Sequence, residues 1–307
     1  MQQTPSVYVG VAGWSYPDWR DTVYRLSVGP AQLSLFGASE SGAATYADDE
    51  LAFLASYVDM IEVNSSFYRI PAVRTTGAWA RRVAAQREFF FTAKLHQAFT
   101  HDLRTDPAQA AQFRDAFAPL RDAGRLRALL AQFRYDTCDS AATRRLLQWL
   151  VREFARFAPL VVEVRHRSWQ EPEALAFLRG LGVTVANLDY PTARDSFDLR
   201  VAGVGASAYL RLHGRNRRAW FARDADVAET YNYDYSEAEI TELATRAREI
   251  LGNAASLTIV ANNHYRGKAV SAALRLKSRL TGKSLRVPPA LLESYPALQR
   301  LSAPHAE

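Results

Sequence analysis

Charged and amide side chains recur at the ends of short apolar runs in this sequence. Most of them come as pairs two positions apart, and side chains two apart on a β-strand share one face. The series is Glu62 with Asn64, Lys94, Gln132, Glu163 with Arg165, Asn187 with Asp189, Arg211 with His213, and Asn262 with His264. Burying an ion costs several kcal/mol unless it is paired or hydrated. The pattern therefore predicts either one hydrated pocket or a sealed ion network that only fills the interior.

The carboxylates of this series are the candidates for acid or base catalysis. Glu163 is our first choice, and Glu62 and Asp189 come next. Burial and nearby cations set the pKa of a carboxyl group, so each of these residues could be tuned to donate or accept a proton.

Cationic side chains could hold an anionic part of a ligand or stabilise developing negative charge. Those at the run ends are Lys94, Arg165 and Arg211. More follow in the segments HGRNRRAW, from His213, and NNHYRGK, from Asn262. In the second segment Gly267 opens a predicted helix whose free N–H groups favour anions. We therefore expect a phosphate or carboxylate group on the ligand.

Aromatic residues follow several of the same runs and could stack on a sugar or a base. They could equally pack the loops against one another. With the polar series they complete the set that we expect to bind substrate: Trp14, Tyr16, Asn64, Tyr68, Lys94, Gln132, Arg165, His166, Trp169, Asn187, Arg211, His213, Tyr233, Asn262 and Asn263.

Metal binding is the main chemical alternative. His213 and His264 could join the carboxylates as ligands of zinc, manganese or iron. The sequence has no His-x-x-x-His spacing and no spacing typical of two histidines and a carboxylate, and cations at the same place would oppose a divalent ion. The single cysteine, Cys138, excludes an internal disulfide and every Cys-based zinc pattern. We expect no metal and no cofactor.

Eight β-branched and aromatic runs must position these residues. They are residues 7–12, 59–63, 89–94, 128–133, 160–164, 183–188, 208–213 and 257–262. Amphipathic stretches alternate with them, at residues 48–57, 75–86, 108–117, 141–157, 171–179, 236–251 and 267–280. This alternation predicts an α/β fold, a single (β/α)₈ barrel of the TIM type. Functional residues of this fold lie at the C-terminal ends of the strands, where the polar series falls.

Three segments depart from the repeat. No helix is predicted between Asp189 and Ala208. The loop from Ser27 to Thr45, after the first strand, is rich in Gly, Ser and Ala and reads as a flexible excursion. The Pro-rich stretch 281–307 reads as a tail that packs on the barrel core of about residues 7–280. No change in composition marks a boundary, so we expect one domain over residues 1–307.

Composition limits the cellular setting and the partners. The 307 residues are 48% hydrophobic, without an apolar run of membrane-spanning length or a signal peptide, so we expect a cytoplasmic protein without a membrane partner. The formal charge of +6 is carried almost wholly by arginine. This charge permits an anionic ligand or a nucleic acid without requiring either. No oligomeric state follows from the sequence.

Six ordered motifs give the chain a family resemblance. They are GWSYPDW from Gly13, EVNSSFYRIP from Glu62, VEVRHRSW from Val162, YLRLHGR from Tyr209, YNYDYS from Tyr231 and NNHYRGKAV from Asn262. Together, from about Val7 to Leu280, they resemble the YecE-like family of TIM-barrel proteins of unknown function. The resemblance implies the barrel and a polar pocket built from these motifs, but no reaction.

The chain departs from the family pattern at two places. Arg134 stands where the family usually has proline, so we expect the following loop to differ from the family pattern. The loop from Ser27 to Thr45 is longer than in many relatives, so we expect the rim beside Trp14 to differ as well.

Three functions fit these observations. The leading one is an enzyme that uses metal-independent acid/base chemistry on a small polar substrate with a phosphate, carboxylate or sugar group. The common barrel glycosidase layout is disfavoured because Gln132 and Arg211 stand where acids would be needed. The alternatives are a nucleic-acid-processing or nucleic-acid-binding barrel, suggested by the RNRR run at 215–218, and a non-catalytic ligand-binding barrel.

Overall fold

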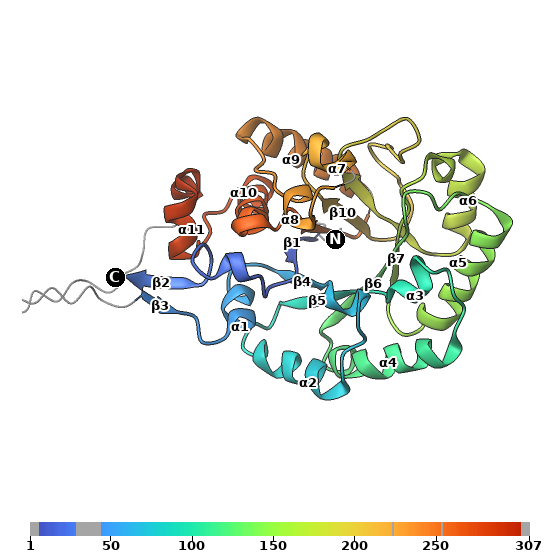
Figure 1. Ribbon diagram of the computed structural model, residues 1–307, viewed down its shortest axis with the longest axis horizontal. Coiled ribbons are helices and arrows are strands. Elements are labelled where there is room, and N and C mark those ends of the chain that lie inside the picture. Colours follow the sequence, from blue (N-terminus) through green and yellow to red (C-terminus); the bar gives the residue numbers. More distant parts are fainter. Residues whose placement is uncertain (1–5, 29–43, 223, 253, 302–307) are drawn as a thin grey trace, which may run out of the picture.

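The strands form a ring of parallel β-structure with helices around it (Figure 1). The computed structural model describes residues 6–28, 44–222, 224–252 and 254–301. The strand order is β8-β7-β6-β5-β4-β1-β11-β10-β9. Their bounds are β1 Ser6–Ala12, β4 Met60–Val63, β5 Phe90–Lys94, β6 Leu126–Gln132, β7 Leu160–Glu163, β8 Thr184–Val185, β9 Asn187–Asp189, β10 Ala208–Leu212 and β11 Ser256–Ala261.

The ring closes through β8 and β9, which together occupy the sixth position. β8 pairs with β7, β9 pairs with β10, and Ala186 between them donates its backbone N–H to the Val162 carbonyl oxygen at 2.9 Å. The eight predicted runs thus become eight strand positions, with the sixth strand interrupted at one residue. The fold is a (β/α)₈ barrel of the TIM type, as predicted.

Helices cover the outside of the ring (Figure 1). Those that match the predicted amphipathic stretches are α1 Glu50–Ala55, α2 Val73–Arg82, α4 Pro107–Asp122, α5 Ala141–Phe154, α6 Pro172–Gly180, α9 Glu237–Leu251 and α10 Lys268–Thr281. The short α3 Gln97–Thr100, α7 Arg217–Phe221 and α8 Val227–Thr230 lie in the connections. The Ser236 hydroxyl accepts the Glu239 N–H while the Glu239 carboxylate accepts the Ser236 N–H, so α9 begins with a capping box.

Side chains alternate between two buried layers along each strand. One layer fills the barrel interior and includes Met60, Phe90, Leu130, Tyr209 and Val260. The other packs between the strands and the helices. The period of two therefore decides which residues reach the mouth of the barrel and which face the helices.

The three unusual segments have different outcomes. The described connection from β9 to β10 contains no helix, as expected. β2 Arg25–Val28 and β3 Ala44–Tyr46 pair as a hairpin at the base of the long loop, and residues 29–43 lie outside the described residues. In the tail, α11 Pro289–Ser294 and the turn Pro296–Leu301 bury Leu291 and Leu298. No helix in the described parts of the chain is long and apolar enough to cross a bilayer.

Candidate functional site

Arg211 lies at the centre of the barrel, between two carboxylates. Its Nη1 donates to Glu163 Oε2 and its Nη2 to Glu62 Oε1, each at 2.5 Å. The Arg211 side chain is 1% exposed, and both glutamates are fully buried. These residues end β10, β7 and β4, so three separate strands meet in this network.

Further groups satisfy the remaining oxygens of both carboxylates. Glu62 Oε2 accepts a hydrogen bond of 3.0 Å from the Tyr209 hydroxyl. Glu163 Oε1 accepts one of 2.8 Å from Arg165 Nε, and His213 Nε2 lies 3.5 Å from the same oxygen. Burial lowers the pKa of His213 to about 4, so its imidazole is neutral at pH 7. Two carboxylates and two guanidinium groups then balance in charge.

This balance changes the role expected of Glu163. Burial by itself would raise its pKa, but Arg211 and Arg165 outweigh burial and hold that pKa well below the ordinary value. A carboxylate stabilised so strongly in its charged form is a weak base. The geometry therefore favours Glu163 and Glu62 as residues that position Arg211, beneath the site rather than in contact with a ligand.

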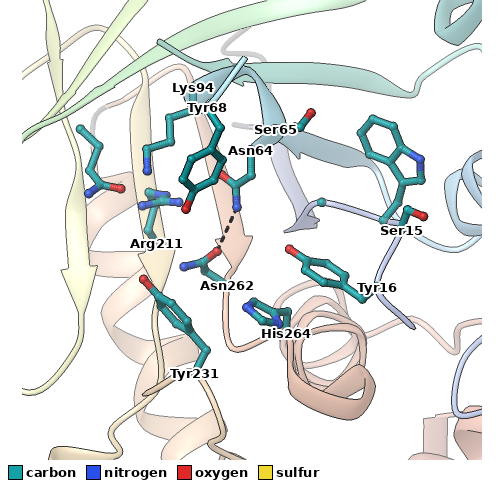
Figure 2. Close-up of a pocket in the computed structure, with 13 residues that line it drawn as sticks. Ser15, Tyr16, Asn64, Ser65, Tyr68, Lys94, Arg211, Tyr231, Asn262 and His264 are labelled. Atoms are coloured by element: carbon teal, nitrogen blue, oxygen red, sulfur yellow. Dashed lines mark hydrogen bonds between the residues drawn. The ribbon is translucent and has the colours of Figure 1, made fainter. Parts of the chain in front are cut away.

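A cavity of about 410 Å³ lies above this network at the C-terminal ends of the strands (Figure 2). Arg211 forms part of its floor. Among the described residues, the lining is Gly13, Trp14, Ser15, Tyr16, Asn64, Ser65, Tyr68, Lys94, Gln132, Arg211, Tyr231, Asn262 and His264. The ion network is thus neither scattered over the surface nor sealed without a cavity beside it.

Lys94 is the other cation of the cavity. Its Nζ lies 3.9 Å from the centre of the Phe67 ring. Burial, followed by the charge of Arg211, lowers the pKa of Lys94 to about 7. The face of the Phe67 ring replaces only part of the hydration that the Lys94 ammonium loses on burial. Lys94 is therefore present as both amine and ammonium at neutral pH.

Aromatic and amide groups form the opposite wall. His264 stacks on Tyr16 with ring centres 4.4 Å apart and lies 5.4 Å from Tyr231. Asn64 Nδ2 donates to Asn262 Oδ1 at 3.4 Å (Figure 2). Burial lowers the pKa of His264, so its imidazole is neutral. This wall offers hydrogen-bond donors and acceptors without a fixed charge.

The prediction that Asn187 and Asp189 point into the mouth is wrong. In the sixth strand Ala186 and Leu188 face the interior, so the polar pair faces the helices. Asp189 accepts hydrogen bonds from Arg215 and Tyr235. A polar residue can face the helices here because segments remote in the sequence supply its hydrogen-bonding partners. These partners offset the cost of burying Asp189, which was the reason to expect it in a hydrated pocket.

Asn187 has a structural role on the same outer face. Its Nδ2 donates to the Tyr209 carbonyl at 3.1 Å, and its Oδ1 accepts the Ala202 N–H at 2.8 Å. The side chain thus joins the β9–β10 connection to the neighbouring strand.

Three other predicted ligand-binding residues lie away from the cavity. Trp169 is buried and donates its indole N–H to the Thr137 carbonyl. Tyr233 donates its hydroxyl to Glu239, and Asn263 donates to the Tyr233 carbonyl. The aromatic and amide types were compatible with a pocket, but these side chains pack loops and helix ends, which was the alternative interpretation.

The prediction of an anion site at the start of α10 does not agree with the structure either. A Cβ on Gly267 would lie 2.8 Å from Val23 and 3.1 Å from Leu291, so this glycine packs against the first loop and the tail. In the RNRR run, Arg215 is paired with Asp189, Glu239 and Glu242. Neither feature faces the cavity.

A second depression, which we call the side groove, adjoins the cavity at Tyr231. It encloses about 950 Å³ and contains Arg165 and His166 from the predicted set. Its other lining residues are Tyr135, Asp136, Cys138, Tyr190, Ala193, Arg194, Asp195, Ser196, Trp220, Phe221, Ala222, Thr230 and Tyr231. The loops after β6, β7, β9 and β10 form it.

Five lining residues were absent from the set expected to bind substrate, and one of them, Gly13, carries no side chain that could have signalled a site. Ser15 and Ser65 adjoin predicted members, and a small hydroxyl carries little signal of its own. His264 is the partner of Asn262 in the polar series, so the period of two could have identified it. Tyr231 arrives from the long β10–α9 connection, and only the folded chain shows its position. Among the residues that the structure describes, no three His, Cys, Asp or Glu side chains converge as metal ligands.

The fold and the cavity define a (β/α)₈ barrel protein with a polar site at the C-terminal ends of its strands. The chain belongs to the family described as Protein of unknown function DUF72, which it matches over residues 8–296.

Relatives cover nearly the whole chain. The UPF0759 protein YunF of Bacillus subtilis strain 168 is 23% identical over 279 residues, 86% of this chain and 90% of that protein. A DUF72 protein from Thermotoga maritima MSB8 has a crystal structure similar to this one, with a TM-score of 0.72, 28% identity and coverage of 90% and 99% of the two chains. For a DUF72 protein from Enterococcus faecalis V583 the TM-score is 0.71, with 21% identity and coverage of 89% and 95%.

Proposed function

We propose that the cavity binds a small polar compound with a carboxylate or phosphate group and transforms it by metal-independent acid/base chemistry. One observation carries this proposal. Both carboxylates beneath the cavity are already neutralised by Arg211 and Arg165, so a protonated Lys94 leaves one positive charge without a counter-ion. An anionic group of the ligand would supply it. We also propose that the chain belongs, within the DUF72 family, to the YecE-like group that its motifs resemble.

The rest of the cavity suits a hydroxylated compound. Asn64, Asn262 and Ser65 offer amides and a hydroxyl, and Trp14 offers an apolar surface. A site with few charges and many neutral hydrogen-bonding groups is suited to sugar-like ligands. For proton transfer, Lys94 has a pKa near the working pH, and the neutral imidazole of His264 lies across the cavity.

Thermal unfolding with small anions tests the binding step. We expect inorganic phosphate and glycerol 3-phosphate to raise the unfolding temperature of the wild type and to do so less as the pH rises through 7. A ligand at one hundred times its Kd adds about 2.7 kcal/mol of stability. Lys94→Met should abolish the response, while Lys283→Met, the same change at an exposed lysine, should leave it intact. An equal response of both variants would contradict the proposal.

Proton exchange tests the chemistry separately. We expect the wild type to incorporate deuterium from D₂O beside the carbonyl or carboxyl group of a bound hydroxy acid or sugar phosphate, followed by NMR. Lys94→Met should slow this exchange at least about 100-fold, the usual scale for losing a general acid or base. Binding without exchange across the panel would favour the non-catalytic ligand-binding alternative.

The side groove favours nucleic acid as a second candidate partner. Trp220 and Tyr190 lie beside Arg165 and Arg194 there, and stacked rings with cations are typical of sites for single strands. Affinity for a fluorescent single-stranded oligonucleotide should then fall steeply with salt and drop in Trp220→Ala. An affinity that depends neither on the salt concentration nor on Trp220 would eliminate nucleic acid as a partner of the side groove.

A further inference from the structure

Lys94 occupies a position that anion binding alone does not explain. It is the last residue of β5 and lines the cavity beside Arg211. In the view of Figure 2 its amine and the Arg211 guanidinium lie on the same side of the cavity, with the Tyr68 and Tyr231 hydroxyls directed toward them. The side chain thus lies in the cavity wall, where a ligand can reach it.

No acidic residue neutralises this amine directly. Across the described ranges of the chain, no hydrogen bond or ion pair engages Lys94 Nζ, and its contact is the Phe67 ring at 3.9 Å. The two carboxylates that could have paired with it are bound to Arg211, and one of them also to Arg165. A lysine whose task is to hold a structural ion pair would not be placed in this way.

The groups that face Lys94 come from several elements, and their sum keeps the amine partly unprotonated. Burial and Arg211 lower its pKa most, Glu163 raises it, Arg165 lowers it and Glu62 raises it, for a result of about 7. From the loop after α3, His101 adds no charge, because burial and Lys94 lower the pKa of His101 to about 4. Desolvation beside another cation is a known way to activate a lysine as a nucleophile.

We infer that Lys94 forms a Schiff base with a ketone or aldehyde group of a small hydroxylated substrate. This inference rests on the proposed function and names the substrate class of the same cavity. The Nζ lone pair attacks the carbonyl carbon, and the carbonyl oxygen takes up a proton to give a carbinolamine. The hydroxyl oxygen then takes up a second proton and leaves as water while the nitrogen lone pair forms the C=N bond. The nitrogen gives up two protons over the sequence, which balances the two that the oxygen takes up. One amine and one carbonyl yield one imine and one water, so no oxidant or reductant is needed.

Neutral groups around the cavity can move these protons. His264 has an imidazole that is unprotonated at neutral pH, and Tyr231 lies 5.4 Å from it between ring centres. Arg211 is fixed by Glu62 and Glu163 and lines the cavity, so it can orient a polar group of the substrate while the carbonyl meets Lys94. The two cations thereby have separate tasks.

Reductive trapping tests the inference, because the chain has only four lysines: Lys94, Lys268, Lys277 and Lys283. The full chain is treated at pH 7 with sodium cyanoborohydride and dihydroxyacetone phosphate, dihydroxyacetone or pyruvate. We expect one adduct per chain, heavier by the mass of the probe minus one oxygen atom. Peptide mapping should place it on Lys94, with a rate that rises to half its maximum at about pH 7.

Two variants separate this chemistry from simple binding. Lys94→Arg keeps the positive charge without a nucleophile, so it should still be stabilised by glycerol 3-phosphate but form no adduct. Lys283→Met should form the adduct at the wild-type rate. Stabilisation of the wild type without any adduct on Lys94 would overturn the inference and leave the binding proposal standing. Labelling of the other three lysines as fast as Lys94 would overturn it as well.

Discussion

At the scale of single residues, the ion network decides what each carboxylate can do. Arg211 joins Glu62 to Glu163, and both carboxylates are fully buried, so removing one charge leaves its partner unpaired in a medium of low dielectric. The same ion pairs that make Glu163 a poor base make both glutamates strong structural anchors.

Glu163→Gln should therefore destabilise the fold by about 3 to 5 kcal/mol, because Arg211 and Arg165 lose a shared counter-ion in the interior. Urea unfolding monitored by circular dichroism measures this loss. The matched control is Glu249→Gln, which removes the solvent-exposed partner of Arg200 and should leave the unfolding midpoint unchanged. Equal effects of the two substitutions would refute the burial argument.

Lys94 should make stability depend on pH in a definite direction. Its pKa falls from 10.5 to about 7 on folding, so between these values the unfolded chain binds a proton that the folded chain does not. Stability then rises with pH across this window. Relative to Lys94→Met, the wild type should gain about 1 to 2 kcal/mol between pH 7.5 and 9 in urea titrations. A constant difference over this range would show that Lys94 keeps an ordinary pKa.

At the scale of elements, the sixth strand shows where the pattern of polar residues was misleading. The six other strands that carry a polar residue at the end follow one rule, in which that residue belongs to the interior layer. In β9 the register places Asn187 and Asp189 on the outer face, where Arg215 and Arg246 on later elements compensate Asp189. The described connection after β9 has no helix of its own, so side-chain bonds such as the one from Ala202 N–H to Asn187 hold it against the barrel.

Asn187→Leu tests this structural role. The substitution leaves the buried Ala202 N–H and the Tyr209 carbonyl without this partner, which should cost about 2 to 6 kcal/mol at about 1 to 3 kcal/mol per group. Because Asn187 faces away from the cavity, phosphate should still raise the unfolding temperature of the variant by the wild-type amount. A variant that stays stable but no longer responds to phosphate would show that Asn187 takes part in ligand binding, which would contradict its structural role.

At the scale of the whole molecule, closure of the barrel brings backbones into close contact. A Cβ at Gly10 on β1 would lie 1.9 Å from the Met60 carbonyl oxygen on β4, and this backbone atom cannot move without disturbing the strand pair.

Gly10→Ala should therefore cost about 3 kcal/mol or more, as overpacking of a closed core does. Gly180→Ala at the end of α6 is the control, since nothing lies within 4 Å of the added methyl group. That change should gain about 0.5 kcal/mol through the lower entropy of the unfolded chain. Differential scanning calorimetry compares both with the wild type, and a tolerated alanine at Gly10 would argue against this strand packing.

The sequence by itself determined the eight strand positions, the helices between them and the inward direction of Glu62, Lys94, Glu163 and Arg211. Local periodicity suffices for these features, because the strand period of two and the apolar stripes of the helices are set by neighbours in the chain. Only the tertiary structure decided that the glutamates neutralise arginines, that Asp189 faces outward and that Lys94 is left without a carboxylate. Those outcomes depend on counter-ions from distant elements, and burial gives such pairings their energy only after the barrel has closed.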